Sequence, residues 1–209
     1  AEGGIIVATP EFVEGARKIC DERGALLLFD EIQTGYGRTG TFLALEHYDV
    51  VPDACSLAKG IGGGFPLGAM AVTERFSGGL PPGSHASTFG GNPLACAAGL
   101  AVLHIIDEEG LIESSRTQGE YLAAGLAEID ARLPTTAGTR GLGLLQGLVL
   151  SDDVDPGATI AAIHAAGLLL TLAGGSVIRV SPPLNVTRDE LDEGLSILER
   201  VIAEAPRKP

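Results

Sequence analysis

Two side chains stand out for the chemistry they could perform. One is a carboxylate and the other an amine, and each follows a short apolar segment of the chain. Asp30 comes directly after the apolar run 25–29, and Lys59 follows the short segment 54–57. A carboxylate at the carboxyl end of a buried parallel strand points into the crevice where open α/β sheets hold their ligands. A lysine among small apolar neighbours becomes a usable nucleophile at neutral pH if it is desolvated, because burial disfavours the ammonium form.

A carboxylate and an amine are the two groups that a pyridoxal phosphate enzyme needs at its cofactor. The carboxylate can keep a ring nitrogen protonated, and the amine can bond to an aldehyde. Each residue also has an ordinary explanation, Asp30 as a turn or cap at a strand end and Lys59 as a surface lysine. The combination, rather than either residue alone, favours the covalent chemistry.

The first part of the chain alternates between strands and helices. Four short segments are predicted strands: 5–8, 25–29, 54–57 and 68–73. The run 25–29 is continuously apolar and is expected to be buried. A helix is expected to begin with Thr9 as N-cap and Pro10 at its first position, and to end near Arg23. This alternation indicates an α/β fold with a mainly parallel sheet.

The rest of the chain is richer in helix. Asn92 and Pro93 predict the start of a long helix reaching about Asp107, which its Ala- and Leu-rich composition predicts to be buried. Further helices are expected over about 111–133, from 155–156 onward, and from the capping box at 187–190. We expect residues 1–110 to be part of a larger ligand-binding domain, and residues 111–209 to form a smaller α+β domain.

Composition narrows the classes of partner. The chain has 209 residues and is 45% apolar, which is enough for a substantial core. It carries 27 acidic and 14 basic residues, giving a formal net charge of −13. An acidic surface repels phosphate backbones and anionic membranes, so no nucleic acid and no membrane partner is expected.

Cysteine and histidine usage bears on metals and on the compartment. Three scattered cysteines, and four histidines without ligand spacing, predict neither a disulfide framework nor a metal site. The cysteine pattern fits a reducing compartment, so a cytoplasmic location is expected. The chain opens without Met, in what reads as a loop running into a strand, so we expect an N-terminal part of a longer chain to precede it.

The segments that carry this chemistry resemble the class III, or ω-amino acid, aminotransferases in order and spacing. The resemblance runs essentially from end to end and depends on four segments: 29–35 (FDEIQTG), 37–40 (GRTG), 57–60 (LAKG) and 84–93 (SHASTFGGNP). Residues 63–70 and 177–184 are most similar to the branch of the family that acts on N2-acetylornithine. The resemblance implies the type I fold of pyridoxal-phosphate-dependent transferases, with this chain as the C-terminal half.

The resemblance also implies a role for each matching residue. Lys59 would bond to the aldehyde of pyridoxal 5'-phosphate and then carry a proton to and from the substrate carbon. Asp30 would pair with the ring nitrogen, and Gln33 would lie near the phenolic oxygen. Ser87 and Thr88 would bind the cofactor phosphate of a neighbouring subunit, which implies a homodimer with shared active sites.

Two further residues are implied to select the substrate. Arg179 matches the arginine that clamps a substrate carboxylate, a task that suits its planar guanidinium. Glu2 matches a glutamate that pairs with this arginine and masks it while the ω-amine of the donor reacts. Replacing Glu2 is therefore expected to erode the preference for an ω-amine.

The function expected from this resemblance is amino transfer from the ω-amine of N2-acetylornithine to 2-oxoglutarate, a step of arginine biosynthesis. One alternative is another class III aminotransferase that acts on succinylornithine, ornithine or 4-aminobutyrate. A different alternative is a non-catalytic remnant that serves dimerisation or regulation. The isolated chain is expected to bind the cofactor weakly and to be inactive.

Overall fold

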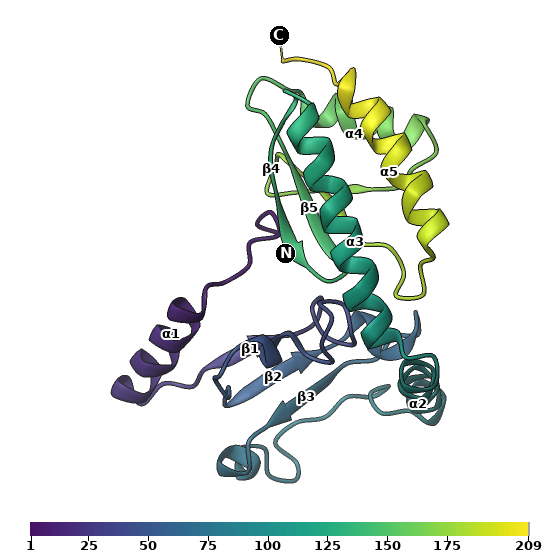
Figure 1. Cartoon of the computed structure of the whole chain (residues 1–209). Helices are drawn as coiled ribbons and strands as arrows, with labels where there is room; N and C mark the ends of the chain where they lie inside the picture. Colours follow the sequence, from purple (N-terminus) through teal and green to yellow (C-terminus); the bar gives the residue numbers. More distant parts are fainter. Residues whose placement is uncertain (209) are drawn as a thin grey trace. The chain divides into compact units, whose positions relative to one another are not determined.

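The computed structural model describes residues 1–208 and divides the chain into two compact units (Figure 1). One unit is Ala8–Ile112, and the other joins Ala1–Val7 to Glu113–Pro209. The first seven residues thus pack with the C-terminal unit, whereas the sequence placed them with the first domain. Within the described residues, no helix is long and apolar enough to cross a membrane.

The unit Ala8–Ile112 contains a three-stranded sheet in the order β1 (Leu28–Asp30), β2 (Ala54–Leu57) and β3 (Ala69–Val72) (Figure 1). β1 and β2 are parallel, with Asp30 opposite Ser56, whereas β2 and β3 are antiparallel. The expectation of a mainly parallel sheet therefore holds in this chain for the first pair alone. The connection from β2 to β3 is shorter than the dozen or more residues that a parallel crossover needs.

The helix α1 (Pro10–Arg23) begins and ends where the sequence predicts. The Thr9 side chain accepts a hydrogen bond from the Phe12 N–H at 3.3 Å, and Gly24 closes the helix in a left-handed conformation with φ +64°. The strand predicted over residues 5–8 does not form. Ile5 has φ +56°, a value that is incompatible with a strand.

Three short 3-10 helices, η1 (Ala44–His47), η2 (Lys59–Gly62) and η3 (Glu74–Gly79), precede α2 (Pro93–Glu108). Asn92 caps α2 by accepting from the Ala95 N–H at 2.9 Å, as predicted. The prediction that α2 is buried is wrong for this chain, because Leu94 and Leu100 are 66% and 58% exposed. Ala95, Gly99 and Ile106 are the buried residues of α2, Gly99 faces η2, and most of the other residues of the helix are exposed.

The prediction that residues 25–29 form a buried strand is also wrong for this chain. β1 spans only Leu28–Asp30 and Leu28 is 60% exposed, and every residue of β3 is exposed as well. The apolar composition of these strands suits a sheet that is covered on both faces. The described part of this chain does not supply that cover.

The second unit contains α3 (Leu111–Arg132) from Glu113 onward, together with α4 (Pro156–Ala165), α5 (Arg188–Ala203) and a four-stranded antiparallel sheet. The strand order is β4 (Thr136–Leu142), β5 (Leu145–Leu150), β7 (Val177–Val180) and β6 (Thr171–Ala173). Thr187 and Glu190 form the predicted capping box at the start of α5, with Glu190 accepting from the Thr187 N–H at 2.8 Å.

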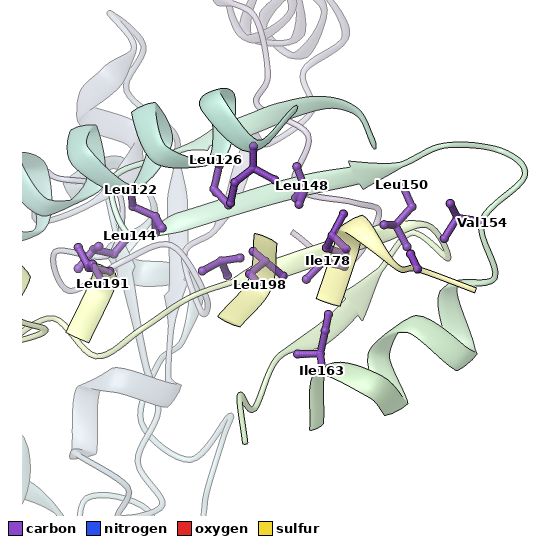
Figure 2. Packing of buried hydrophobic residues seen from close by; sticks show 14 of the residues in the cluster. Leu122, Leu126, Leu144, Leu148, Leu150, Val154, Ile163, Ile178, Leu191 and Leu198 are labelled. Atoms are coloured by element: carbon purple, nitrogen blue, oxygen red, sulfur yellow. The ribbon is translucent and has the colours of Figure 1, made fainter. Parts of the chain in front are cut away.

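The core of this unit lies between the sheet and its helices (Figure 2). Leu122 and Leu126 of α3 pack with Leu148 of β5, Ile178 of β7 and Leu198 of α5, and all are at most 2% exposed. Complete burial of each such side chain stabilises the fold by about 1.5–3 kcal/mol. The opposite face of the sheet carries a smaller apolar cluster that includes Ile5.

Candidate functional site

Asp30 lies at the carboxyl end of β1, where the sequence places it. Its Oδ1 accepts hydrogen bonds from the Ile32 N–H at 3.0 Å and from the Ser56 hydroxyl at 3.2 Å. Ser56 belongs to the neighbouring strand β2, so the strand pairing itself orients the carboxylate. Asp30 is exposed and is therefore accessible to a ligand that carries a cationic ring nitrogen.

Lys59 follows β2 and is the first residue of η2. Its φ is +49°, a left-handed conformation that costs a residue other than glycine about 1–3 kcal/mol. Asp30, the last residue of β1, and Lys59, two residues after β2, thus lie at the carboxyl ends of two adjacent parallel strands, as the sequence predicts. Lys59 is exposed, so the described residues of this chain do not by themselves desolvate its amine.

Tyr36 connects the loop after β1 to the lysine segment. It is 7% exposed, its ring packs edge-on against Phe42 at 5.4 Å, and a Cβ added to Gly60 would lie 3.6 Å from the Tyr36 Cβ. Burial raises the pKa of the Tyr36 phenol. Like Lys59, Tyr36 has a positive φ, here +58°, so a second strained residue packs against Gly60, the residue that follows Lys59.

Glu31 is a positioning residue that the sequence analysis missed. It is 2% exposed, and its carboxylate accepts from the N–H groups of Ala44 and Leu45, at 3.1 and 2.7 Å, and from the Thr34 hydroxyl. These bonds join the turn after Asp30 to the start of η1. Its place beside Asp30 was the one signal in the sequence, and it does not reveal which donors the carboxylate meets.

Gln33 and Arg38 lie in the same loop and are half-buried. Burial lowers the pKa of the Arg38 guanidinium, which nevertheless stays charged at neutral pH. The loop therefore places an amide and a cation after the strand that carries Asp30. The position of Gln33 three residues beyond Asp30 is compatible with the contact that the resemblance implies for it.

Ser87 and Thr88 lie in an exposed loop that precedes α2. The Ser87 hydroxyl accepts a hydrogen bond from the Gly90 N–H at 3.0 Å, which closes a short turn. Hydroxyls in an exposed, glycine-flanked loop are suited to bind an anion such as a phosphate. Their assignment to a neighbouring subunit's cofactor stays a prediction.

Arg179 lies in β7 and forms an ion pair with Glu2, the pairing that the resemblance implies. Its Nε also donates to the Thr171 Oγ1 at 3.0 Å. The Arg179 side chain is 16% exposed and that of Glu2 is 73% exposed. Because the Glu2 carboxylate is exposed, solvent screens this ion pair, and a competing carboxylate can reach the guanidinium.

The predicted residues thus form two groups, each within one compact unit. Asp30, Gln33, Lys59, Ser87 and Thr88 belong to Ala8–Ile112, and the pair Glu2–Arg179 belongs to the other unit. Asp30 and Lys59 fit pyridoxal phosphate, because they offer a carboxylate for a ring nitrogen and an amine for an aldehyde, and the hydroxyls of Ser87 and Thr88 suit the phosphate of a neighbouring subunit's cofactor. Among residues 1–208, no group of three or more His, Cys, Asp or Glu side chains could hold a metal ion.

Known proteins match this chain over nearly its whole length. An acetylornithine aminotransferase from Caldanaerobacter subterraneus subsp. tengcongensis is 47% identical over 203 residues, covering 97% of this chain and 51% of the relative. A succinylornithine transaminase from Yersinia enterocolitica is 42% identical over 210 residues, covering 99% of this chain and 50% of that relative. The chain therefore spans about half the length of the curated relatives it matches.

A solved structure agrees with the sequence relatives. The ornithine aminotransferase from Toxoplasma gondii, described with partial occupancy of PLP at its active site, superposes with a TM-score of 0.90 at 32% identity. The superposition covers 98% of this chain and 49% of that one. The family model described as aminotransferase class-III matches residues 1–202. This chain belongs to the class III aminotransferases.

Proposed function

We propose that the full-length protein containing this chain transfers the ω-amino group of N2-acetylornithine to 2-oxoglutarate, with pyridoxal phosphate as cofactor. The observation that carries this proposal is the placement of Asp30 and Lys59 after two adjacent parallel strands in a class III aminotransferase chain. The acetyl group is proposed from the identity with the acetylornithine aminotransferase relative.

Pyridoxal phosphate, when bound, supplies an aldehyde for covalent attachment of an amine and a ring that accepts electrons released at the substrate carbon. Asp30 keeps the proton on the ring nitrogen, and Ser56 holds its carboxylate in place. Lys59 Nζ carries the proton between the reacting carbons. The Gln33 amide would donate toward the phenolic oxygen, and Ser87 and Thr88 would bind the phosphate of the neighbouring subunit's cofactor.

Arg179 and Glu2 account for the use of two different substrates. While Glu2 neutralises Arg179, the donor is admitted through its ω-amine, because no free guanidinium attracts its α-carboxylate. The α-carboxylate of 2-oxoglutarate displaces the exposed Glu2 side chain and binds the guanidinium in a bidentate manner. The weakness of the exposed ion pair makes this exchange reversible.

The test is borohydride reduction of the full-length protein loaded with pyridoxal phosphate, followed by peptide mapping and turnover measurements. Reduction is expected to fix the cofactor to Lys59. Lys59→Ala should lower kcat by at least about 100-fold, the lower range for loss of a general acid–base group. Lys18→Ala, which changes an exposed lysine of α1, serves as the matched control. A tag on any other lysine would contradict the proposal.

A succinyl group in place of the acetyl group is the second candidate, favoured by the identity with the succinylornithine transaminase relative. A panel of N2-acetylornithine, N2-succinylornithine, ornithine and 4-aminobutyrate distinguishes the donors by kcat/KM. The isolated chain is expected not to turn over any of them, since it spans half the length of its relatives. Turnover by the isolated chain would contradict that expectation.

We also propose that the full-length protein is a cytoplasmic homodimer in which the Ser87–Thr88 loop serves the partner's cofactor. The exposure of both residues supports this arrangement. The test mixes two inactive full-length variants, Lys59→Ala and Thr88→Asp. Recovery of activity in the mixed dimer supports shared sites, and failure to recover any contradicts them.

A further inference from the structure

The face of the four-stranded sheet opposite its helices carries a row of four residues in register. Arg140 of β4 pairs with Gly147 of β5, Gly147 with Arg179 of β7, and Arg179 with Thr171 of β6. Directly opposed residues of antiparallel strands share one face of a sheet. The two arginines therefore lie on the same face, and a glycine without a side chain separates them.

Residues 2–5 lie across this row. Ile5 is 3% exposed and packs with Leu145, Ala173 and Val177. A Cβ added to Gly147 would lie 3.2 Å from the Ile5 Cβ and 2.8 Å from the Val177 Cγ1. Gly147 thus makes the room that Ile5 occupies. Ile5 is held at φ +56°, a conformation that β-branched residues adopt only where their surroundings enforce it.

The turn between β6 and β7 holds the same segment from another side. The Gly174 N–H donates to the Glu2 carbonyl at 2.8 Å. A Cβ added to Gly174, whose φ is +56°, would lie 2.5 Å from the Gly3 carbonyl oxygen. Any side chain at Gly174 therefore displaces the backbone of the segment, because the atom it meets is main-chain.

Arg140 completes the enclosure. A Cβ added to Gly4 would lie 2.8 Å from the Arg140 Nη2, so the guanidinium packs directly against the segment. The backbone of residues 2–5 is therefore held by β5, by Gly174 and by Arg140. From this backbone the Glu2 side chain, which is 73% exposed, reaches Arg179.

We propose that Gly174 and Gly147 are specificity-determining positions, because they fix the backbone from which Glu2 reaches Arg179. With the backbone fixed, the mask over Arg179 opens and closes by rotation of the Glu2 side chain alone. A residue larger than glycine at either position moves Glu2 away and leaves Arg179 open to carboxylates. The consequence for donor choice rests on the proposed function. The Glu2–Arg179 ion pair and its effect on carboxylate binding do not depend on that function.

The chain offers a matched pair of variants for the test. Gly174→Ala and Gly175→Ala both place alanine at a positive φ, +56° and +81°, but a Cβ at Gly175 meets no atom within 4 Å. Both carry the same kind of backbone strain, and only the first pushes on the Glu2 segment. Glu2→Gln serves as the reference for an arginine without its charged mask.

The first measurement uses the 209-residue chain and needs no catalysis. Titration with 2-oxoglutarate is followed through the Arg179 Nε–Hε signal in 1H–15N NMR spectra. Glu2→Gln and Gly174→Ala are expected to tighten binding by about tenfold, the scale of one charge-assisted hydrogen bond. Gly175→Ala should bind like the unsubstituted chain. If Gly174→Ala also binds like the unsubstituted chain, or if Glu2→Gln changes nothing, the proposal is overturned.

The second measurement uses the full-length enzyme and compares kcat/KM for N2-acetylornithine with that for an α-amino donor, glutamate. The ratio should fall in Gly174→Ala and stay unchanged in Gly175→Ala. If the unsubstituted enzyme does not transaminate at all, the proposed function fails. The NMR titration still shows whether Gly174 controls the access of a carboxylate to Arg179. If Gly174→Ala does not fold, Gly147→Ala decides both measurements, because its methyl group presses on side chains of Ile5 and Val177 instead of on backbone.

Discussion

Glu31 offers the sharpest test of how the loop beside Asp30 is held. Its buried carboxylate accepts from two backbone N–H groups, of Ala44 and Leu45, and from the Thr34 hydroxyl. Glu31→Ala leaves these donors without their acceptor. Each buried unsatisfied donor costs about 1–3 kcal/mol, so the two N–H groups alone give about 2–6 kcal/mol. Entry of water into the space left by the side chain favours the lower half, about 3 kcal/mol.

Glu31→Gln should cost less, about 1.5 kcal/mol, because it keeps the shape and one acceptor oxygen but turns an amide donor toward other donors. The assay is amide hydrogen exchange of Ala44 and Leu45, which reports opening of this loop separately from the rest of the chain. A loss of 3 kcal/mol corresponds to about 100-fold faster exchange where opening is local.

The matched control is Glu46, whose carboxylate caps the same 3-10 helix but is exposed. It accepts from the Leu43 N–H at 2.6 Å. Glu46→Ala should accelerate exchange by only about two- to fivefold, since an exposed cap contributes roughly 0.5–1 kcal/mol and water replaces the lost acceptor. Equal acceleration by Glu31→Ala and Glu46→Ala would refute the reasoning, because it would mean that burial of the carboxylate does not matter.

Two further predictions concern stability and are measured by urea unfolding. Gly119→Ala in α3 should destabilise by at least about 2 kcal/mol, because its Cβ would lie 2.4 Å from backbone carbon in the β4–β5 turn. Gly15→Ala in α1 meets nothing within 4 Å and should instead stabilise by about 0.5–1 kcal/mol; equal signs would contradict the pair. The Leu27 N–H and the Arg17 guanidinium hold the pKa of Asp53 below its ordinary value, so its stabilising contribution is present above about pH 4 and lost as the pH falls through the folded pKa. Asp53→Asn should therefore lower stability near neutral pH and flatten its decline toward about pH 3, and an unchanged acid decline would contradict this.

The sequence predicted the helices better than their surroundings. Thr9, Asn92 and Thr187 each cap a helix through a side chain that reaches a backbone N–H three residues ahead. Such signals are local, so they can be recognised without knowing the fold. Burial is not local. The apolar faces of β1 and α2 were expected to be covered, but the described part of this chain leaves them exposed. Composition indicates that a segment suits burial, but it does not tell which other segment covers it.

The residues of the candidate site show the same difference between local and long-range signals. Asp30 and Lys59 could be identified because their types and their positions after predicted strands carry a chemical meaning. Glu31 and Gly174 could not, because their roles depend on donors and backbone that fold against them from elsewhere in the sequence. In the sequence, Glu31 is simply a second acid beside Asp30, the predicted site residue, and Gly174 is a glycine typical of a turn.

The Glu2–Arg179 pair joins residues 177 positions apart, and proximity along the chain does nothing to bring them together. In the proposed function this ion pair opens for each acceptor molecule, so it has to be weak, yet it has to close in the same place after every turnover. A weak pair cannot secure its own geometry, so the precision has to come from the backbone that carries it. The strained Ile5, the enclosed glycines and Arg140 supply that precision, and the Glu2 side chain that they position is 73% exposed.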